Sequence, residues 1–272
     1  MSFHLSNKLL GIINFLTFIF SIPILVAGIW LSKSGVSDCG LTADTNLIRI
    51  GALIMIVSLA GFIGSCYGVG WLLWAYLVII LLLILSGLGF TVFTFVVSHK
   101  GSGETVAGKG YKEYKLGNYS NWIQTIVNET QNWNKIKTCL VDTKVCTGFK
   151  NKYLNYTVEK FHKERLNAIQ SGCCKPSNDC GFTYRSPMNR TEEKGVYSNP
   201  DCKAWDNDPT VLCFNCKSCK AGVADNMNRT LKKEATVNVV FLILLIIVYC
   251  IGCCAFWNNK RDDVYNNQVW KP

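Results

Sequence analysis

The chain has 272 residues, of which 49% are hydrophobic and 17% are charged, and its formal net charge is +10. The apolar residues are gathered in four runs, and the positive charge lies mostly in residues 98–235, where Lys and Arg outnumber Asp and Glu by 22 to 14. So uneven and so apolar a composition argues against a soluble protein. It favours a chain that crosses a membrane several times.

Each apolar run is long enough to cross a hydrocarbon core, which needs roughly 20 residues of helix. The runs contain no Asp, Glu or Lys, and only Arg49 stands near an edge. A cleaved signal peptide is the alternative for the first run, but its apolar core exceeds the usual length of roughly 7–15 residues. We therefore expect an all-α membrane protein with four transmembrane helices, at residues 9–31, 47–66, 71–97 and 236–257.

Five polar segments remain between and beside the spans. They are a head (1–8), a small loop (32–46), a turn (67–70), a large loop (98–235) and a tail (258–272). Basic residues near the span ends weakly favour both termini inside, and the long loop does not count in that comparison. The chemistry of the loops described next decides the orientation.

The large loop carries every N-x-S/T sequon of the chain, and such sequons in a polar loop predict glycosylation. Nine of the 14 cysteines lie in the same loop, and Cys39 in the small loop makes ten, which predicts disulfides in an oxidising compartment. Both loops should therefore lie outside the cell and both termini in the cytoplasm. The expected glycosylation acceptors are Asn118, Asn128, Asn155, Asn189 and Asn228, of which Asn228 lies very near the fourth span.

The disulfide connectivity stays open at this stage. Cys173 and Cys174 are adjacent, and a bond between neighbours would be badly strained, so each should pair elsewhere. Each bridge should contribute about 2–4 kcal/mol. The cysteines expected in bridges are Cys39, Cys139, Cys146, Cys173, Cys174, Cys180, Cys202, Cys213, Cys216 and Cys219.

Small residues recur at intervals of seven along the first two spans. In lipid no hydrophobic force drives helices together, so small residues mark close contacts. The pattern predicts a tightly packed, antiparallel, left-handed helix pair, which is either a dedicated assembly scaffold or ordinary helix packing. The expected packing residues are Asn14, Ser21, Gly28, Gly51, Ser58, Gly61 and Ser65.

Asn14 and Asn238 are the strongly polar side chains inside the spans. We expect interhelical hydrogen bonds from them, because a transport path usually needs ionisable groups and the spans have none. Four further cysteines lie at the cytoplasmic ends of the second and fourth spans, where reversible palmitoylation occurs. The alternative is that they are simply small apolar residues at helix ends; they are Cys66, Cys250, Cys253 and Cys254.

The large loop should be mainly helical before residue 171. Apolar spacing predicts helices at 103–116, 119–140 and 156–170, and a further helix at 221–234 that runs into the fourth span. From Ser171 the composition changes to Cys, Pro, Asn, Asp and Gly, which is typical of turns held by disulfides.

Five segments, in order along the whole chain, resemble one family. They are SIPILVAGIWL (21–31), GFIGSCYG (61–68), GCCKPSNDCGFTY (172–184), NPDCKAWDN (199–207) and LCFNCKSCKAG (212–222). They look like the tetraspanin family, in its plant branch. One position departs from the animal pattern, which has Gly after the cysteine pair where this chain has Lys175 and Pro176.

This resemblance implies a function in organising membrane microdomains. It implies lateral association with membrane proteins and related tetraspanins in homo- and hetero-oligomers, with the large loop choosing partners. It also implies the plasma membrane and secreted vesicles as locations, palmitate on cysteines matching Cys66, Cys253 and Cys254, and roles in differentiation, signalling or trafficking.

Three enzyme-like patterns carry little weight. Cys213, Cys216 and Cys219 form CxxCxxC, but the fourth cysteine of an iron–sulfur motif is missing. Residues 64–68 have the spacing of a nucleophile elbow but lie within a span. His4, His99 and His162 are scattered without metal-ligand spacing. We therefore expect no catalytic residues, no cofactor and no metal.

The expected function is a non-enzymatic membrane scaffold whose partners are membrane proteins and lipid. The alternative is a four-span receptor or adhesion module that binds an extracellular ligand directly. A channel or junction protein is disfavoured by the small first loop and the uncharged spans. The basic loop favours attraction to anionic wall polysaccharide or lipid only weakly, and nucleic acid is not an expected partner because the charge lies outside the cell.

Overall fold

The structure is a computed structural model that describes residues 5–33, 43–153, 155–186, 188–191 and 197–269. The chain divides into two compact units. We call the unit formed by Met1–Val92 and Thr236–Pro272 the membrane domain, and the unit Phe93–Ala235 the loop domain.

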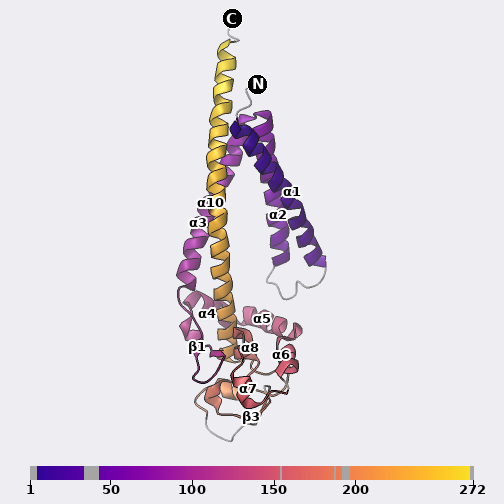
Figure 1. The fold of residues 1–272 in the computed structure, drawn as a ribbon, viewed down its shortest axis with the longest axis vertical. Helices are drawn as coiled ribbons and strands as arrows, with labels where there is room; N and C mark the ends of the chain where they lie inside the picture. The colour runs from indigo at the N-terminus through magenta and orange to yellow at the C-terminus, as the bar shows by residue number, and fades with distance from the viewer. Residues whose placement is uncertain (1–4, 34–42, 154, 187, 192–196, 270–272) are drawn as a thin grey trace. The chain divides into compact units, whose positions relative to one another are not determined.

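Four long helices confirm the prediction of four spans (Figure 1). They are α1 (Leu5–Lys33), α2 (Ala43–Tyr67), α3 (Gly70–Ser98) and α10 (Lys217–Val269). Helices suit these sequences because backbone groups in lipid must be hydrogen-bonded within the protein. Helix α10 has 53 residues and includes the segment 221–234, so the fourth span and the preceding helix are one continuous element.

Helices α1 and α2 lie side by side along their length (Figure 1). Glycine allows their backbones to approach closely. A Cβ added at Gly28 would lie 2.9 Å from the side chain of Ile48, and one at Gly51 would lie 2.9 Å from that of Leu25. The two glycines therefore alternate with larger residues from the facing helix, as expected for small-residue packing in lipid.

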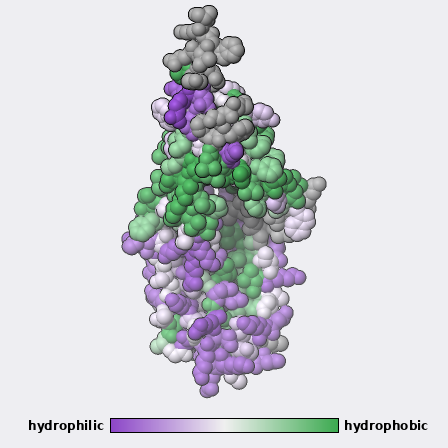
Figure 2. All heavy atoms as spheres, turned by 45° about the horizontal axis from the view of Figure 1, so that its top comes forward, coloured by the Kyte–Doolittle hydropathy of each residue, from purple (hydrophilic) through white to green (hydrophobic). Residues whose placement is uncertain are grey.

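The four span helices share one core near the turn between α2 and α3. Leu10 of α1, Leu73 of α3 and Ala255 of α10 are each fully buried within it. Gly68, which starts this turn, has a φ of 68°, a conformation that favours glycine. On the face shown in Figure 2, apolar side chains gather over the spans, which is the surface that lipid would cover.

The loop domain is built from short helices and two small antiparallel sheets. Its helices are η2 (Leu116–Asn118), α4 (Asn121–Asn128), α5 (Thr130–Asp142), α6 (Val145–Tyr153), α7 (Val158–His162), α8 (Ala168–Cys173), η3 (Asn178–Cys180) and α9 (Asp201–Ala204). Strand β1 (Glu104–Thr105) pairs with β2 (Lys112–Glu113), and β3 (Thr183–Ser186) pairs with β4 (Asn189–Thr191).

The predicted helix at 103–116 is wrong, because this segment contains β1 and β2 instead. Glycines explain the difference, since they favour turns over helix. Gly108 has a φ of 72° in the turn between the strands. Gly110 donates its backbone N–H to the carbonyl of His162 at 2.7 Å, and a Cβ there would overlap the carbonyl of Lys163.

Two other predicted helices are interrupted. The segment 119–140 is divided at Glu129, which lies in an extended conformation between α4 and α5. The segment 156–170 is divided before Asn167, whose side chain accepts from the N–H of Gln170 and so caps α8. Helix α6 was not predicted, although its buried residues Cys146, Phe149 and Tyr153 recur at helical spacing.

Aromatic side chains and cystines form the core of the loop domain. Phe161 is fully buried, and its ring meets those of Phe149 and Tyr153 edge-on at 5.8 Å each. Such edge-to-face pairs contribute about 0.5–1.5 kcal/mol beyond the burial of their area. The helices α6 and α7 are therefore held together by ring contacts.

Candidate functional site: the loop domain and its buried lysine

The predicted cysteine framework contains four described disulfides in the loop domain. They join Cys146 to Cys174, Cys173 to Cys219, Cys180 to Cys202 and Cys213 to Cys216. Cys139 is also disulfide-bonded. Cys39 lies outside the described residues, as do most of the small loop and His4.

The adjacent cysteines at the end of α8 bond to different elements. Cys174 ties α8 to α6 through Cys146, and Cys173 ties α8 to the start of α10 through Cys219. Both cysteines are fully buried. One short motif thus fixes three helices around the centre of the loop domain.

Glycines allow α8 and α10 to touch backbone to backbone. A Cβ added at Gly172 would overlap the carbonyl of Ser218, and one at Gly222 would overlap the carbonyl of Ala168. The Ser218 hydroxyl donates to the Gly172 carbonyl at 3.1 Å. The glycine before the cysteine pair is therefore required by the contact that the Cys173–Cys219 bridge closes.

Asp201 caps the first turn of α10 from another part of the sequence. Its two carboxylate oxygens accept from the backbone N–H groups of Lys217 and Ser218, at 2.7 and 2.8 Å. A carboxylate at this position satisfies free helix donors and complements the helix dipole. Asp201 precedes Cys202, so the Cys180–Cys202 bridge holds the cap in place.

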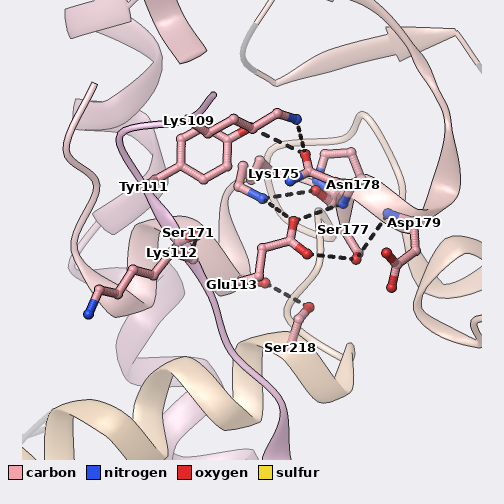
Figure 3. Close-up of polar contacts among 12 residues, drawn as sticks. Lys109, Tyr111, Lys112, Glu113, Ser171, Lys175, Ser177, Asn178, Asp179 and Ser218 are labelled. Atoms are coloured by element: carbon pink, nitrogen blue, oxygen red, sulfur yellow. Dashed lines mark hydrogen bonds and ion pairs between the residues drawn. The ribbon is translucent and has the colours of Figure 1, made fainter. Parts of the chain in front are cut away.

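Lys175, the residue that departs from the animal pattern, is almost completely buried at 2% exposure. Figure 3 shows its ammonium group pointing toward Glu113. Nζ lies 3.1 Å from Oε1 of Glu113 and 3.3 Å from the carbonyl oxygen of Pro176. It also lies 4.6 Å from the centre of the Tyr111 ring. All three ammonium hydrogens therefore have an acceptor or an aromatic face.

Glu113 joins strand β2 to the segment after the cysteine pair. Its Oε1 accepts from Lys175 and from the backbone N–H of Asn178, the latter at 2.9 Å. Asn178 is held in turn by Lys109, whose Nζ donates to Oδ1 at 2.7 Å, and by the Tyr111 hydroxyl (Figure 3). A polar network thus replaces the Gly turn of the animal pattern.

Burial and neighbouring cations lower the pKa values of this cluster. Burial lowers the pKa of Lys175 to about 8, although the Glu113 carboxylate opposes the shift. Burial also lowers the pKa of Arg190 to about 10 and, with the nearby lysines and Arg190, lowers the pKa of His162. The Arg190 guanidinium stacks 4.2 Å from the centre of the Tyr184 ring, which offsets part of its desolvation.

A hollow of about 260 Å³ borders the Lys175–Glu113 pair. Its wall includes the acidic residues Asp179 and Asp201 and the basic residue Lys217, together with three serines. All three serines are already bonded within the protein: Ser171 donates to the Lys112 carbonyl, Ser218 to the Gly172 carbonyl and Ser177 to the Glu113 carboxylate. The hollow can accept a small zwitterionic or amide-bearing group.

Four of the five predicted glycosylation acceptors are exposed: Asn118, Asn128, Asn155 and Asn189. Asn228 differs, because it is 2% exposed and its Nδ2 donates to the carbonyls of Lys100 and Gly101, at 3.2 Å each. Its amide nitrogen therefore holds the chain after α3 against α10.

The seven predicted packing residues of the first two spans are all buried. The side chains of Asn14 and Tyr76 occupy the space that a Cβ at Gly61 would need. Asn14 donates its Nδ2 to Leu10 in the same helix, and its side chain also shares the expected interhelical hydrogen bond, with the Tyr76 hydroxyl of α3. Asn238 of α10 does bond across helices, to the Gly87 carbonyl and the Thr91 hydroxyl of α3.

The four remaining cysteines carry free thiols. Cys66, Cys250 and Cys254 are exposed and Cys253 is partly exposed. All four lie in the membrane domain, whereas the CxxCxxC cysteines of the loop domain are all bonded in pairs. The free thiols remain open to modification, and the CxxCxxC thiolates are not free to bind iron.

Comparison with known proteins decides the family. The model of the tetraspanin family matches residues 6–255. The chain is 55% identical to Tetraspanin-8 of Arabidopsis thaliana over 98% of both chains. The chain is a tetraspanin.

Other relatives from the same plant support this assignment. Tetraspanin-7 is 52% identical, over 94% of this chain and 97% of its own length. Protein TORNADO 2 is 40% identical, over 96% of each chain. No solved structure matches the chain. The family resemblance of the loop segments is therefore confirmed, and this tetraspanin is a multi-pass membrane protein.

The sequence of this tetraspanin did not indicate Glu113, Tyr111 or Asp201 as important. Glu113 lies 62 residues from Lys175, in a segment that was predicted to be helical. A signal for a partner was nevertheless present. Lys175 directly follows two buried cysteines, so the chain itself holds it close to the core. A buried lysine requires a carboxylate or an aromatic ring as a neighbour.

Proposed function

We propose that this tetraspanin is a membrane scaffold that gathers other membrane proteins and related tetraspanins into microdomains. The observation that supports it best is the division of the chain into an apolar four-helix unit and a bridged polar unit, linked by α3 and α10. The spans carry lipid-facing apolar residues and small-residue contacts, while the loop domain offers a fixed polar surface. Lateral association and partner choice are thus assigned to different units.

The proposed orientation places the loop domain outside the cell and both termini in the cytoplasm, at the plasma membrane. Disulfides in the loop domain support this, because they persist in oxidising compartments. Of the free thiols, Cys66 lies at the C-terminal end of α2, and Cys250, Cys253 and Cys254 lie in the C-terminal half of α10. There they are candidates for palmitoylation, which would add about 0.8 kcal/mol of lipid preference per buried CH₂.

A receptor that binds a soluble or wall ligand directly is the second candidate. The hollow beside Lys175 and Glu113 favours it, because its wall brings carboxylates, a lysine and serines together. In the scaffold reading the same hollow would receive a side chain of a partner protein.

The deciding experiment is affinity purification from the native membrane in a mild and in a strong detergent, with the bound proteins identified. We expect a defined set of membrane proteins in mild detergent that is lost in strong detergent. Recovery of the tetraspanin alone in both detergents would contradict scaffolding and favour the receptor.

A variant pair then tests the role of the loop domain. Asp179→Ala combined with Lys217→Ala changes the rim of the hollow but keeps the Asp201 cap, which uses only the backbone of Lys217. We expect this variant to lose part of the partner set. Lys150→Ala, at an exposed position on α6, is the control and should keep all partners.

A further inference from the structure

Trp122 is an exposed aromatic residue in an otherwise well-buried domain. Its exposure is 42%, whereas Trp133 and Trp205 of the same domain are 5% and 4% exposed. Among the described residues of the loop domain after α3, the other strongly exposed large hydrophobic residues are Val158 and Val211. Trp122 packs against Phe93 of α3, which is also exposed, and the apolar surface that the two rings share suggests a partner outside the domain.

The position of Trp122 is fixed by its helix and by α3. The neighbouring α4 residues Ile123 and Val127 are fully buried, so α4 is held firmly. The Trp122 ring stands edge-on to the ring of Phe93, with centroids 5.2 Å apart and an interplanar angle of 89°. Trp122 must therefore lie at nearly the same depth as Phe93.

Phe93 lies near the boundary of the hydrocarbon layer. At 1.5 Å per residue, Phe93 is about 7 Å from the end of α3 at Ser98, after which His99 and Lys100 follow. Trp74, 60% exposed near the other end of α3, is about 28 Å away along the helix. This distance is close to the thickness of a hydrocarbon core, about 30 Å. A hydrocarbon layer that begins near Trp74 would therefore end near Phe93, within the last two turns of α3.

We propose that Trp122 inserts into the lipid headgroup layer and anchors α4 of the loop domain on the membrane surface. An indole ring suits this place, because it is apolar with one polar N–H, and Trp is enriched where the membrane meets water. The anchor does not depend on which face of the membrane is extracellular, nor on the proposed scaffold function.

The residues around Trp122 favour lipid over a second protein. Its exposed neighbours on α4 are Asn121, Thr125 and Asn128, which would face headgroups and water. A stable protein interface needs about 800 Å² from each partner with an apolar centre, and one indole among amides and hydroxyls does not provide that. A single interfacial side chain needs no wider apolar patch.

The test uses ¹⁹F NMR of the full chain in nanodiscs, with 5-fluorotryptophan at the eight tryptophan positions. Trp122→Phe identifies the Trp122 resonance by its loss, and Trp122→Tyr provides a second assignment. Nitroxide lipids labelled near the headgroup are then compared with a soluble gadolinium chelate. Trp133→Phe assigns a buried tryptophan of the same domain, and Trp74→Phe assigns one in the span.

We expect the nitroxide lipid to broaden the Trp122 and Trp74 resonances at least twofold more than that of Trp133. Broadening of Trp122 by the gadolinium chelate alone would place it in water and overturn the proposal. Protection from both reagents would show that protein covers it, as in a dimer, and would overturn the proposal equally.

Discussion

Lys175 departs from the animal motif, and its neighbours in the fold accommodate the change. The lysine is buried at a position that the animal pattern gives to glycine, and Glu113 with Tyr111 compensates its charge. Desolvation still dominates, since the pKa of Lys175 falls to about 8. The net contribution of this network to stability is therefore small or negative near neutral pH.

A pH dependence follows from this lysine. In the unfolded chain the pKa of Lys175 is about 10.4. Below pH 8 the charge on Lys175 therefore lowers the free energy of unfolding by roughly 3 kcal/mol, compared with the same side chain without its charge. Between pH 8 and 10.4 the folded state has lost the proton that the unfolded state still holds, so this cost falls as pH rises. The Tyr111 hydroxyl, whose pKa burial raises to about 12, stays neutral there.

We expect Lys175→Met to remove this rise in stability. The unfolding temperature of the wild type should increase relative to the variant between pH 7.5 and 9.5, measured by intrinsic fluorescence in one detergent. Lys112→Met, at an exposed position on β2, should keep the wild-type profile. Parallel pH profiles for wild type and Lys175→Met would show that Lys175 keeps an ordinary pKa in the fold.

Asn228 has two possible roles, as a glycosylation acceptor and as a hydrogen-bond donor inside the fold, and two variants distinguish them. Because its Nδ2 is bonded to two carbonyls, a glycan on that atom is incompatible with the fold. Thr230→Ala destroys the sequon but leaves the amide, so it should change neither glycosidase-sensitive mobility nor stability. Asn228→Gln should lower stability by about 1–3 kcal/mol, because buried carbonyls lose their donor.

The exposed sequons provide the comparison. We expect Asn→Gln at Asn118, Asn128, Asn155 or Asn189 each to remove one glycan step on a gel, without loss of stability. A mobility shift for Thr230→Ala would show that Asn228 carries a glycan and would contradict the bonded arrangement at Lys100 and Gly101.

At the scale of elements, the contact between α8 and α10 has little tolerance for added volume. Gly222→Ala places a methyl group on the Ala168 carbonyl, which is backbone and cannot rotate away. We expect a loss of about 1–3 kcal/mol, as for overpacked cores. Gly148→Ala in α6 is the matched control and should increase stability. No atom lies within 4 Å of the added methyl group, and alanine favours a helix over glycine by about 0.5–1 kcal/mol. Thermal unfolding of the purified variants tests both, and equal stability of the two would contradict the close contact.

Sequence patterns predicted the span helices far better than the loop helices. A span is specified by its own composition, because lipid demands a long uncharged helix whatever the neighbours are. The segment 103–116 instead depends on Gly110 meeting the chain at His162 and Lys163, and the division at Glu129 depends on how α4 and α5 pack. Such contacts between distant residues leave no local periodicity.

The candidate site was predictable only in part for the same reason. Adjacency alone indicated that Cys173 and Cys174 bond to different cysteines, but the ten candidate cysteines allow hundreds of connectivities. The partners Cys146 and Cys219 follow from the placement of α6 and α10 around α8. Lys175 was singled out by its departure from the animal motif, and only the fold brings Glu113 to it.

At the scale of the whole molecule, the two units draw stability from different sources. The described disulfides all lie in the loop domain, while the spans rely on lipid and helix packing. Reduction in detergent should therefore unfold the loop domain and leave the spans helical. Near-ultraviolet circular dichroism should lose its aromatic signal, while most of the far-ultraviolet helical signal remains.

Pairs of cysteine variants make this argument quantitative. Removing both members of Cys173–Cys219, 46 residues apart, should cost about 4 kcal/mol by the loop-entropy estimate, and removing Cys213–Cys216, 3 apart, only about 1.6 kcal/mol. Double serine variants at each pair test this through the unfolding temperature of the loop domain and the fraction of protein that reaches the cell surface. We expect the variant without Cys173–Cys219 to be retained inside the cell and the variant without Cys213–Cys216 to reach the surface nearly normally. Equal retention would mean that the short bridge acts through the native state, by holding the chain where Cys216 meets the Asp201 carbonyl at the start of α10.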